Sequence, residues 1–340
     1  MKQQATRKTS IGGQALIEGV MMRGPEKTAM AVRDPSGEIV LESWETSGKK
    51  RSKVFKLPFI RGVFNFIDSM RIGYRSLLRS AELAGFEEES QSRDSADTAV
   101  SFSENDTAEH TANDSSDAKK KTTGMFEGFG MTLVLVLSML LGVAIAVGLF
   151  MTLPTFLFNR LREMVPVLQN KVWGNVLRAV MEGLIRILLF VGYIFAVSLM
   201  KDIKRVFMYH GAEHKTIFCY EKGEALTVEN VRRQTRFHPR CGTSFMILML
   251  VVGIVVSMFI SVSNPIIRTG IKLLTIPIIV GIGYELIKLA GRSNHWLVRA
   301  ISAPGLWLQR ITTKEPTDDM IEVAITSFTE VAPPDDSDLL

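Results

Sequence analysis

Residues 129–151 read FGMTLVLVLSMLLGVAIAVGLFM, a run without a charged side chain. About 20 consecutive apolar residues suffice for a helix to cross the hydrocarbon core of a bilayer. The run therefore predicts a transmembrane helix. The whole chain is 46% hydrophobic, with a mean hydropathy of +0.17. That value is high for a soluble protein and low for one made only of membrane helices, so soluble parts are expected as well.

Three further apolar stretches follow the first, at about 180–200, 244–262 and 271–290. The second carries Glu182 and Arg186 near its start, where Arg186 can pair with Glu182 by helical spacing. The last contains Pro277 and Glu285. The predicted fold is a mainly α membrane protein, with four transmembrane helices in a domain spanning 123–292.

Positive charge in the connecting segments predicts the orientation. The loop 201–243 holds nine Lys or Arg residues, while 152–179 holds four and 263–270 holds one. Cytoplasmic loops carry the excess of Lys and Arg. We therefore expect a multi-pass protein of the bacterial inner membrane, with both termini and the loop 201–243 in the cytoplasm.

The N-terminal part predicts a small α+β cytoplasmic region. Residues 1–56 are β-rich, with strand character at 28–33 and 38–44 and a turn sequence between them. Residues 57–85 repeat apolar side chains at helical spacing and carry arginines on another stripe. This pattern is typical of an amphipathic helix on a membrane surface, and equally of a core helix with a basic, solvated face.

Two acidic segments frame the rest of the chain. The stretch 86–122 is rich in Ser, Asp, Glu and Thr and predicts a disordered linker. Residues 293–340 predict an interfacial segment, an amphipathic helix at 318–329 and an acidic tail. Ten acids in 86–117 and eight in 315–340 leave 39 bases against 17 acids elsewhere. We attribute this basic excess to topology and anionic membrane lipid, not to nucleic acid. Residues 86–122 and 315–340 are the expected surfaces for protein partners, and an oligomer is compatible with the sequence.

The chemistry-bearing motif lies in the loop 201–243. His210 and His214 frame Glu213 in a His-x-x-Glu-His pattern, the reversed zinc-peptidase motif. On a helix these three side chains share one face, so two imidazoles can chelate one metal ion while the carboxylate moves protons. His238 and Cys241 follow in the same loop and are the expected suppliers of the remaining ligand. Other carboxylates that can serve as the third ligand are Glu221, Glu224 and Glu285.

This pattern supports three kinds of function. A divalent metal, zinc first, held with an open position predicts a metal-dependent hydrolase with Glu213 as acid/base. A closed set of His210, His214, His238 and Cys241 predicts a structural clamp in a non-enzymatic scaffold. Cys241 at a helix N-terminus beside Arg240 predicts a thiolate nucleophile for acyl transfer, with His210 or His214 as base. A transporter is disfavoured because no inverted repeat is visible.

Basic residues surround the motif. Lys215, Arg236 and Arg240 are expected to bind an anionic substrate such as a lipid head group, although basic residues there also satisfy the topology rule.

Four stretches together resemble one family, at residues 12–25, 209–216, 237–245 and 309–316. They are similar to the signatures of the YqhQ-like family, bacterial membrane proteins of unknown function described as predicted metal-dependent enzymes. The resemblance covers the chain apart from the acidic linker and the last dozen residues. It implies that the N-terminal segment with Glu18 and Arg23 belongs with the site, where glycines allow close backbone approach.

Overall fold

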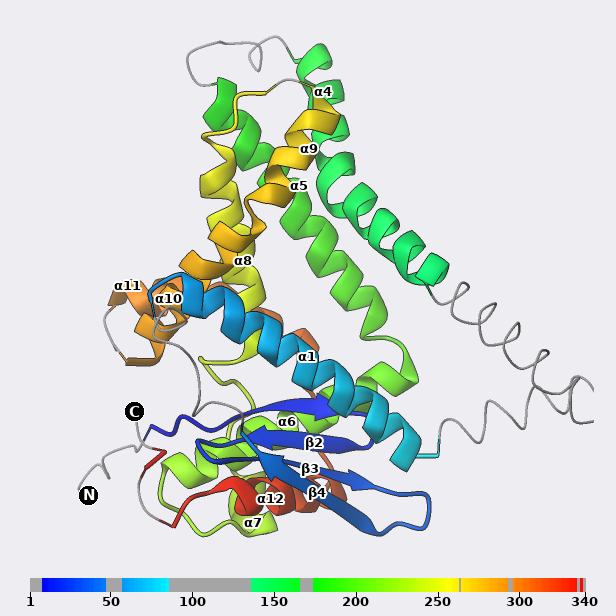
Figure 1. Cartoon of the computed structure of the whole chain (residues 1–340), viewed down its shortest axis with the longest axis vertical. Helices are drawn as coiled ribbons and strands as arrows, with labels where there is room; N and C mark the ends of the chain where they lie inside the picture. Colours follow the sequence, from blue (N-terminus) through cyan, green and yellow to red (C-terminus); the bar gives the residue numbers. More distant parts are fainter. Residues whose placement is uncertain are drawn as a thin grey trace, which may run out of the picture.

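The computed structural model describes two layers, a small sheet with its covering helices and a taller group of helices above it (Figure 1). Between them runs the helix α1 (Ile60–Leu83). The described residues are 8–46, 57–85, 136–165, 174–262, 264–292, 296–334 and 337–338, with side chains of 290–302 left out. The predicted acidic linker 86–122 and the start of the first apolar run lie outside these residues.

The N-terminal sheet is an antiparallel meander in the order β1-β2-β3-β4. Both predicted strands and their turn are confirmed, since Asp34 and Gly37 close the link between the last two strands. The glycine-rich stretch before them forms a further hairpin, in which Glu18 adopts a positive φ of 50°. The strands are β1 (Gly12–Leu16), β2 (Gly19–Arg23), β3 (Lys27–Arg33) and β4 (Ile39–Glu45).

Both faces of the two central strands, β2 and β3, are buried. Met22 and Ala29 point to one face, where they pack with Met320 and Phe328 of α12 (Asp318–Val331) and with α6 (Lys201–Glu221). On the other face Met21, Leu16, Met30 and Val32 pack against α1. Burying a Leu or Met side chain contributes about 1.5–3 kcal/mol. The predicted C-terminal amphipathic helix is therefore part of the core. The tail beyond it also docks at Asp338, which accepts from the Tyr220 hydroxyl at 3.2 Å.

The helix α1 buries its small residues and exposes its large apolar ones. Gly62, Gly73, Ser76 and Ser80 form its buried face. Ile67 remains 55% exposed, on a row spaced by three or four residues along the opposite side. The amphipathic helix is confirmed: Ile72 and Leu77 pack against the sheet while the arginine stripe is exposed, and its placement on a membrane surface stays a prediction. The exposed row comprises Ile60, Phe64, Ile67, Met70, Tyr74 and Leu78.

The upper layer holds the membrane-spanning candidates. Two helices are long and apolar enough to cross a bilayer, Val136–Met164 and α5 (Gly174–Val197). The third predicted span is a shorter apolar helix, α8 (Gly242–Ser257). The fourth is a pair, α9 (Pro265–Leu274) and α10 (Ile276–Arg292), bent by 46°. Pro277 sits at the start of α10, and since proline donates no backbone hydrogen bond, it suits a break there.

Shorter elements connect these helices. The first long helix contains a π-helical segment, η3 (Gly148–Thr152), and ends as α4 (Leu153–Met164). The short helix α7 (Val228–Arg232) lies beside α6 and α12, and α11 (Trp296–Thr312) contacts α8.

No proline or capping signal separates the second apolar stretch from the motif, which predicts one helix continuing through residues 201–218. That prediction is wrong, because the structure has two helices there. α5 ends at Val197, and Met200 adopts an extended conformation with ψ 136° before α6 starts at Lys201. The physical reason is packing: α6 must turn to lie against β1 and α12. A missing proline or cap therefore does not ensure a continuous helix.

Candidate metal centre

The motif helix α6 is buried over its second half. His210, Glu213 and His214 lie on one face of it, as their spacing predicts. Glu213 is 5% exposed and His214 is 1% exposed. The two imidazole rings stand edge to face, with centroids 4.4 Å apart. Such burial is unusual for polar side chains and requires partners for each polar atom.

The third candidate ligand lies at the start of α8. Cys241 is the N-cap of that helix, and its sulfur accepts from the Thr243 backbone N–H. His210 Nε2 lies 3.1 Å from Cys241 Sγ. One ligand atom from each of His210, His214 and Cys241 lies within 4.8 Å of the others, so the three can hold one ion. The predicted position of Cys241 at a helix N-terminus is confirmed.

Backbone carbonyls fix the orientation of both imidazoles. His210 Nδ1 donates to the Thr312 carbonyl at 2.9 Å, and His214 Nδ1 donates to the Arg236 carbonyl. A carbonyl only accepts, so each Nδ1 carries the proton and each Nε2 of a neutral ring keeps its lone pair. The His214 Nε2 atom is buried without a hydrogen-bond partner. Ligating histidines are held in this way, with the far nitrogen on a carbonyl. The residues therefore fit a metal ion.

Glu213 faces the same cluster. Its Oε2 is buried without a hydrogen-bond partner. Burial raises the pKa of the Glu213 carboxyl above its ordinary value, against the opposing charges of His210 and His214. β1 covers it closely, because a Cβ at Gly13 would lie 3.0 Å from Glu213 Cδ. The expectation that an N-terminal glycine permits close backbone approach to the site is confirmed at this position.

Without a metal, the thiol and the imidazole form a charged pair. Burial opposes charge on His210, but the adjacent Cys241 sulfur outweighs it and raises the His210 pKa to about 9. Burial likewise opposes ionisation of Cys241, yet His210 and His214 hold its pKa well below the ordinary thiol value. A thiolate is the form that binds metals and attacks electrophiles.

His238 lies beside this group without joining it. Its ring centroid is 5.6 Å from that of His214, but its Nε2 lies 3.6 Å from Glu221 Oε2. Glu221 is in turn paired with Arg240. The backbone of His238 is held on both sides by Gln309, whose amide accepts from its N–H and donates to its carbonyl.

The three predicted substrate-binding cations are engaged by carboxylates. Lys215 is buried and lies 2.7 Å from Glu315, which also pairs with Arg236. Arg240 pairs with Glu221 and donates to the Thr9 carbonyl at 2.6 Å. These contacts join the loop before α8 to both ends of the chain.

The other predicted carboxylates lie apart from the three ligands. Glu221 belongs to the His238 pair, Glu224 accepts from Gln234, and Glu285 pairs with Arg61 of α1. In the N-terminal hairpin Glu18 pairs with Arg205 and accepts from Tyr209, the residue before His210. Arg23 instead pairs with Asp68 of α1.

Two residues of the site have no chemical signature in the sequence. Thr312 acts through its backbone carbonyl, and Gln309 acts by holding the His238 backbone and the Ser244 hydroxyl. The resemblance at residues 309–316 was the signal that pointed to this segment, but it did not indicate a role for either residue.

Comparison with known proteins agrees with that resemblance. Residues 57–333 match the family model described as "Protein of unknown function (DUF1385)". The chain is 34% identical over 322 residues to the "Uncharacterized protein YqhQ" of Bacillus subtilis (strain 168), which covers 94% of this chain and 91% of that relative. No solved structure matches the chain.

Gly211 provides a test of the close contact between α6 and the segment that follows α11. A Cβ at this position would lie 2.0 Å from the Lys314 carbonyl oxygen, so Gly211→Ala must push the segment after α11 away from α6. We expect a loss of about 1–3 kcal/mol in stability, because the added methyl group overpacks a buried contact. The measurement is the thermal unfolding midpoint of the purified protein in detergent. Gly142→Ala is the matched control, since a Cβ there meets nothing within 4 Å; equal midpoints for the two variants would contradict the close contact.

Proposed function

The chain belongs to the DUF1385 family of proteins of unknown function, and we propose that it is a metal-dependent enzyme, a hydrolase, acting at the cytoplasmic face of a bacterial membrane. One observation carries the proposal. His210, His214 and Cys241 converge within 4.8 Å, beside the buried and unpartnered Oε2 of Glu213. Buried atoms with free lone pairs are costly unless a cation or a donor meets them.

The ligand set favours zinc. Two imidazole nitrogens and one thiolate match the ligands that zinc takes in proteins, and three protein ligands leave one position open. When bound, such an ion polarises a substrate carbonyl or phosphoryl oxygen and makes water more acidic. The chain's own contribution is orientation, because Thr312 and Arg236 fix both rings through their carbonyls.

Glu213 is assigned the acid/base role. It stands one residue before His214 on the ligand face and has no partner for Oε2. Because burial raises the pKa of this carboxyl, it can take up a proton more readily than an exposed glutamate. A general base works best when its pKa approaches the working pH.

A purely structural clamp is less well supported. It needs a fourth protein ligand, and among the described residues His238 is the histidine beside the group. Its Nε2 is also buried without a hydrogen-bond partner, but it faces Glu221 at 3.6 Å, and its backbone is fixed by Gln309. The open arrangement is the one expected of a catalytic site.

Acyl transfer by Cys241 is a second candidate function. The observation that favours it is the 3.1 Å contact between His210 Nε2 and Cys241 Sγ at the N-terminus of α8. There the depressed pKa of the thiol and the helix dipole favour the thiolate. His210 would then act as the acid for a leaving group.

The membrane placement follows from charge and exposure. We propose four crossings, by the helix Val136–Met164, α5, α8 and the bent pair of α9 and α10. An even number puts both termini on the side of the basic loop 201–243, the cytoplasm. The exposed apolar row of α1 would then lie in the lipid interface, and the metal centre would lie just beneath the bilayer.

Reporter fusions test this placement. A phosphatase that is active only outside the cytoplasm should be active when fused after Asn264, because that residue precedes the fourth crossing. Fused after Lys222 or at the C-terminal Leu340, it should be inactive. Activity at Leu340 would mean that α9 and α10 do not cross as a pair, and would contradict the four-crossing arrangement.

Elemental analysis tests the metal centre. The protein, purified in detergent without chelators, should carry about one zinc ion per chain, because three ligands converge on one point. The His210→Ala/His214→Ala double variant should carry none.

His238→Ala is the matched control, since this histidine is buried like His214 but faces Glu221. It should retain the metal. Loss of metal in this control would favour the four-ligand clamp, and no metal in the wild type after attempted reloading would remove the metal-dependent proposal.

The acid/base role is tested with Glu213→Gln, which keeps the shape of the side chain. Turnover of nitrophenyl ester and phosphodiester probes should fall by about 10²- to 10⁴-fold, because the amide cannot take up a proton. The metal content should stay unchanged. Activity that survives chelation but is lost in Cys241→Ser would instead establish the acyl-transfer function.

A further inference from the structure

A second polar cluster lies in the upper layer, away from the metal centre. Glu182 of α5 accepts from Arg178 at 2.8 Å and from Lys272 of α9 at 2.6 Å. Arg268, also on α9, approaches the same carboxylate at 3.4 Å. All four side chains are buried. The helices α4 and α9 and the start of α5 lie at the end of the molecule farthest from the sheet (Figure 1).

The charges of this cluster do not balance. Three cations share one carboxylate, and within the described residues no second carboxylate pairs with them. Arg268 is fully buried. Its Nη1 donates to the Ile260 carbonyl and its Nε approaches Glu182, but neither Nε nor Nη2 makes a hydrogen bond. Buried charge without compensation is strongly unfavourable, and ionisable groups inside membrane spans commonly mark ligand sites. The cluster therefore lacks an anion.

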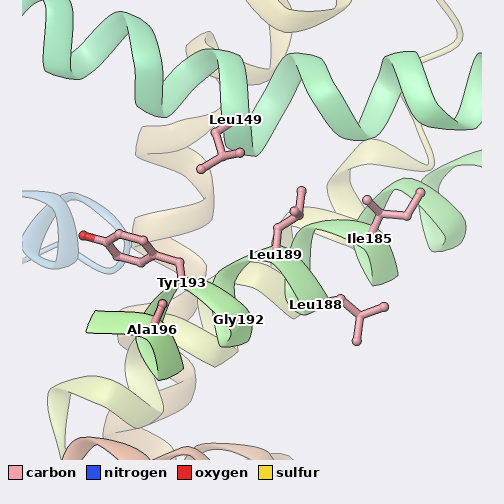
Figure 2. A pocket seen from close by; sticks show the side chains of 7 residues that line it. All are labelled: Leu149, Ile185, Leu188, Leu189, Gly192, Tyr193 and Ala196. Carbon is pink, nitrogen blue, oxygen red and sulfur yellow. The ribbon is translucent and has the colours of Figure 1, made fainter. Parts of the chain in front are cut away.

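An apolar groove begins next to this cluster. Its volume is about 540 Å³, and it runs between η3 and α5, with Ile185, Leu189 and Tyr193 along one side and Leu149 on the other (Figure 2). Arg186 connects the two features. It follows Ile185 in the chain, donates to the Phe150 carbonyl at 2.7 Å, and lies one helical turn from Glu182.

We propose that the cluster and the groove together bind one anionic phospholipid. The phosphate of the lipid would bind Arg268 and Lys272, entering beside the partly exposed Arg186. One acyl chain of the same lipid would fill the groove. Arginine suits this role because its planar fork of donors matches phosphate oxygens. The apolar lining favours a lipid over a free phosphate ion, because a phosphate ion has no apolar group that could occupy the groove.

Lipid binding by the purified full-length chain tests the proposal. After delipidation in detergent, phosphatidylglycerol should raise the thermal unfolding midpoint more than phosphatidylcholine does, because a ligand that binds only the folded state stabilises it. Arg268→Gln should reduce the phosphatidylglycerol retained through purification by about fivefold, the change expected from about 1 kcal/mol of lost binding. Arg160→Gln is the control, since this exposed arginine pairs with Glu163 on α4. Equal effects of the two lipids, or equal retention in both variants, would overturn the proposal.

Gly192→Leu tests the groove independently of the buried charges. Gly192 lines the groove, and a Cβ there meets nothing within 4 Å, so the variant should fold. It should retain less phosphatidylglycerol than the wild type. If inorganic phosphate alone stabilises the wild type and Gly192→Leu equally, and this variant retains lipid normally, the cluster binds a free oxyanion and the lipid assignment is wrong.

Discussion

The burial of one polar helix face is the constraint on which the rest of this structure depends. α6 lies against β1 and α12, so Glu213 and His214 are buried and His210 is half-buried beside them. Buried polar atoms need partners, and these come from segments distant in sequence. Thr312 ends α11, Arg236 lies in the loop before α8, and Cys241 begins α8. The loop and the last helices thus supply partners for the buried polar atoms of one helix, and the sheet covers them.

Local patterns predicted much of the fold and most of the site. The strand character of 28–33 and 38–44 predicted two strands of the sheet, and the spacing of Met320, Ile321 and Phe328 predicted the apolar face of α12. The spacing of His210 and His214 places them on one face of any helix. In these cases the physical cause acts within a few residues, so the sequence carries it.

Contacts between distant segments could not be predicted in this way. The sequence offered His238 and Cys241 equally as ligands, whereas in the structure Cys241 lies 3.1 Å from His210 and His238 contacts Glu221 and Gln309. The break between α5 and α6 likewise depends on what α6 packs against. The sequence of α1 was compatible with two placements for the same reason. Which face of the helix is covered depends on the segments that pack against it.

The two polar clusters lack partners of opposite charge. At the candidate metal centre the unpartnered atoms include His214 Nε2 and Glu213 Oε2, which offer electron pairs, as does His238 Nε2 beside them. In the upper layer the unpartnered atoms are N–H groups of Arg268, beside more cations than one carboxylate can neutralise. Lone pairs that converge in a buried site select a cation, and convergent N–H donors select an anion. The same accounting of buried atoms therefore supports both proposals, a metal ion at one cluster and a lipid phosphate at the other.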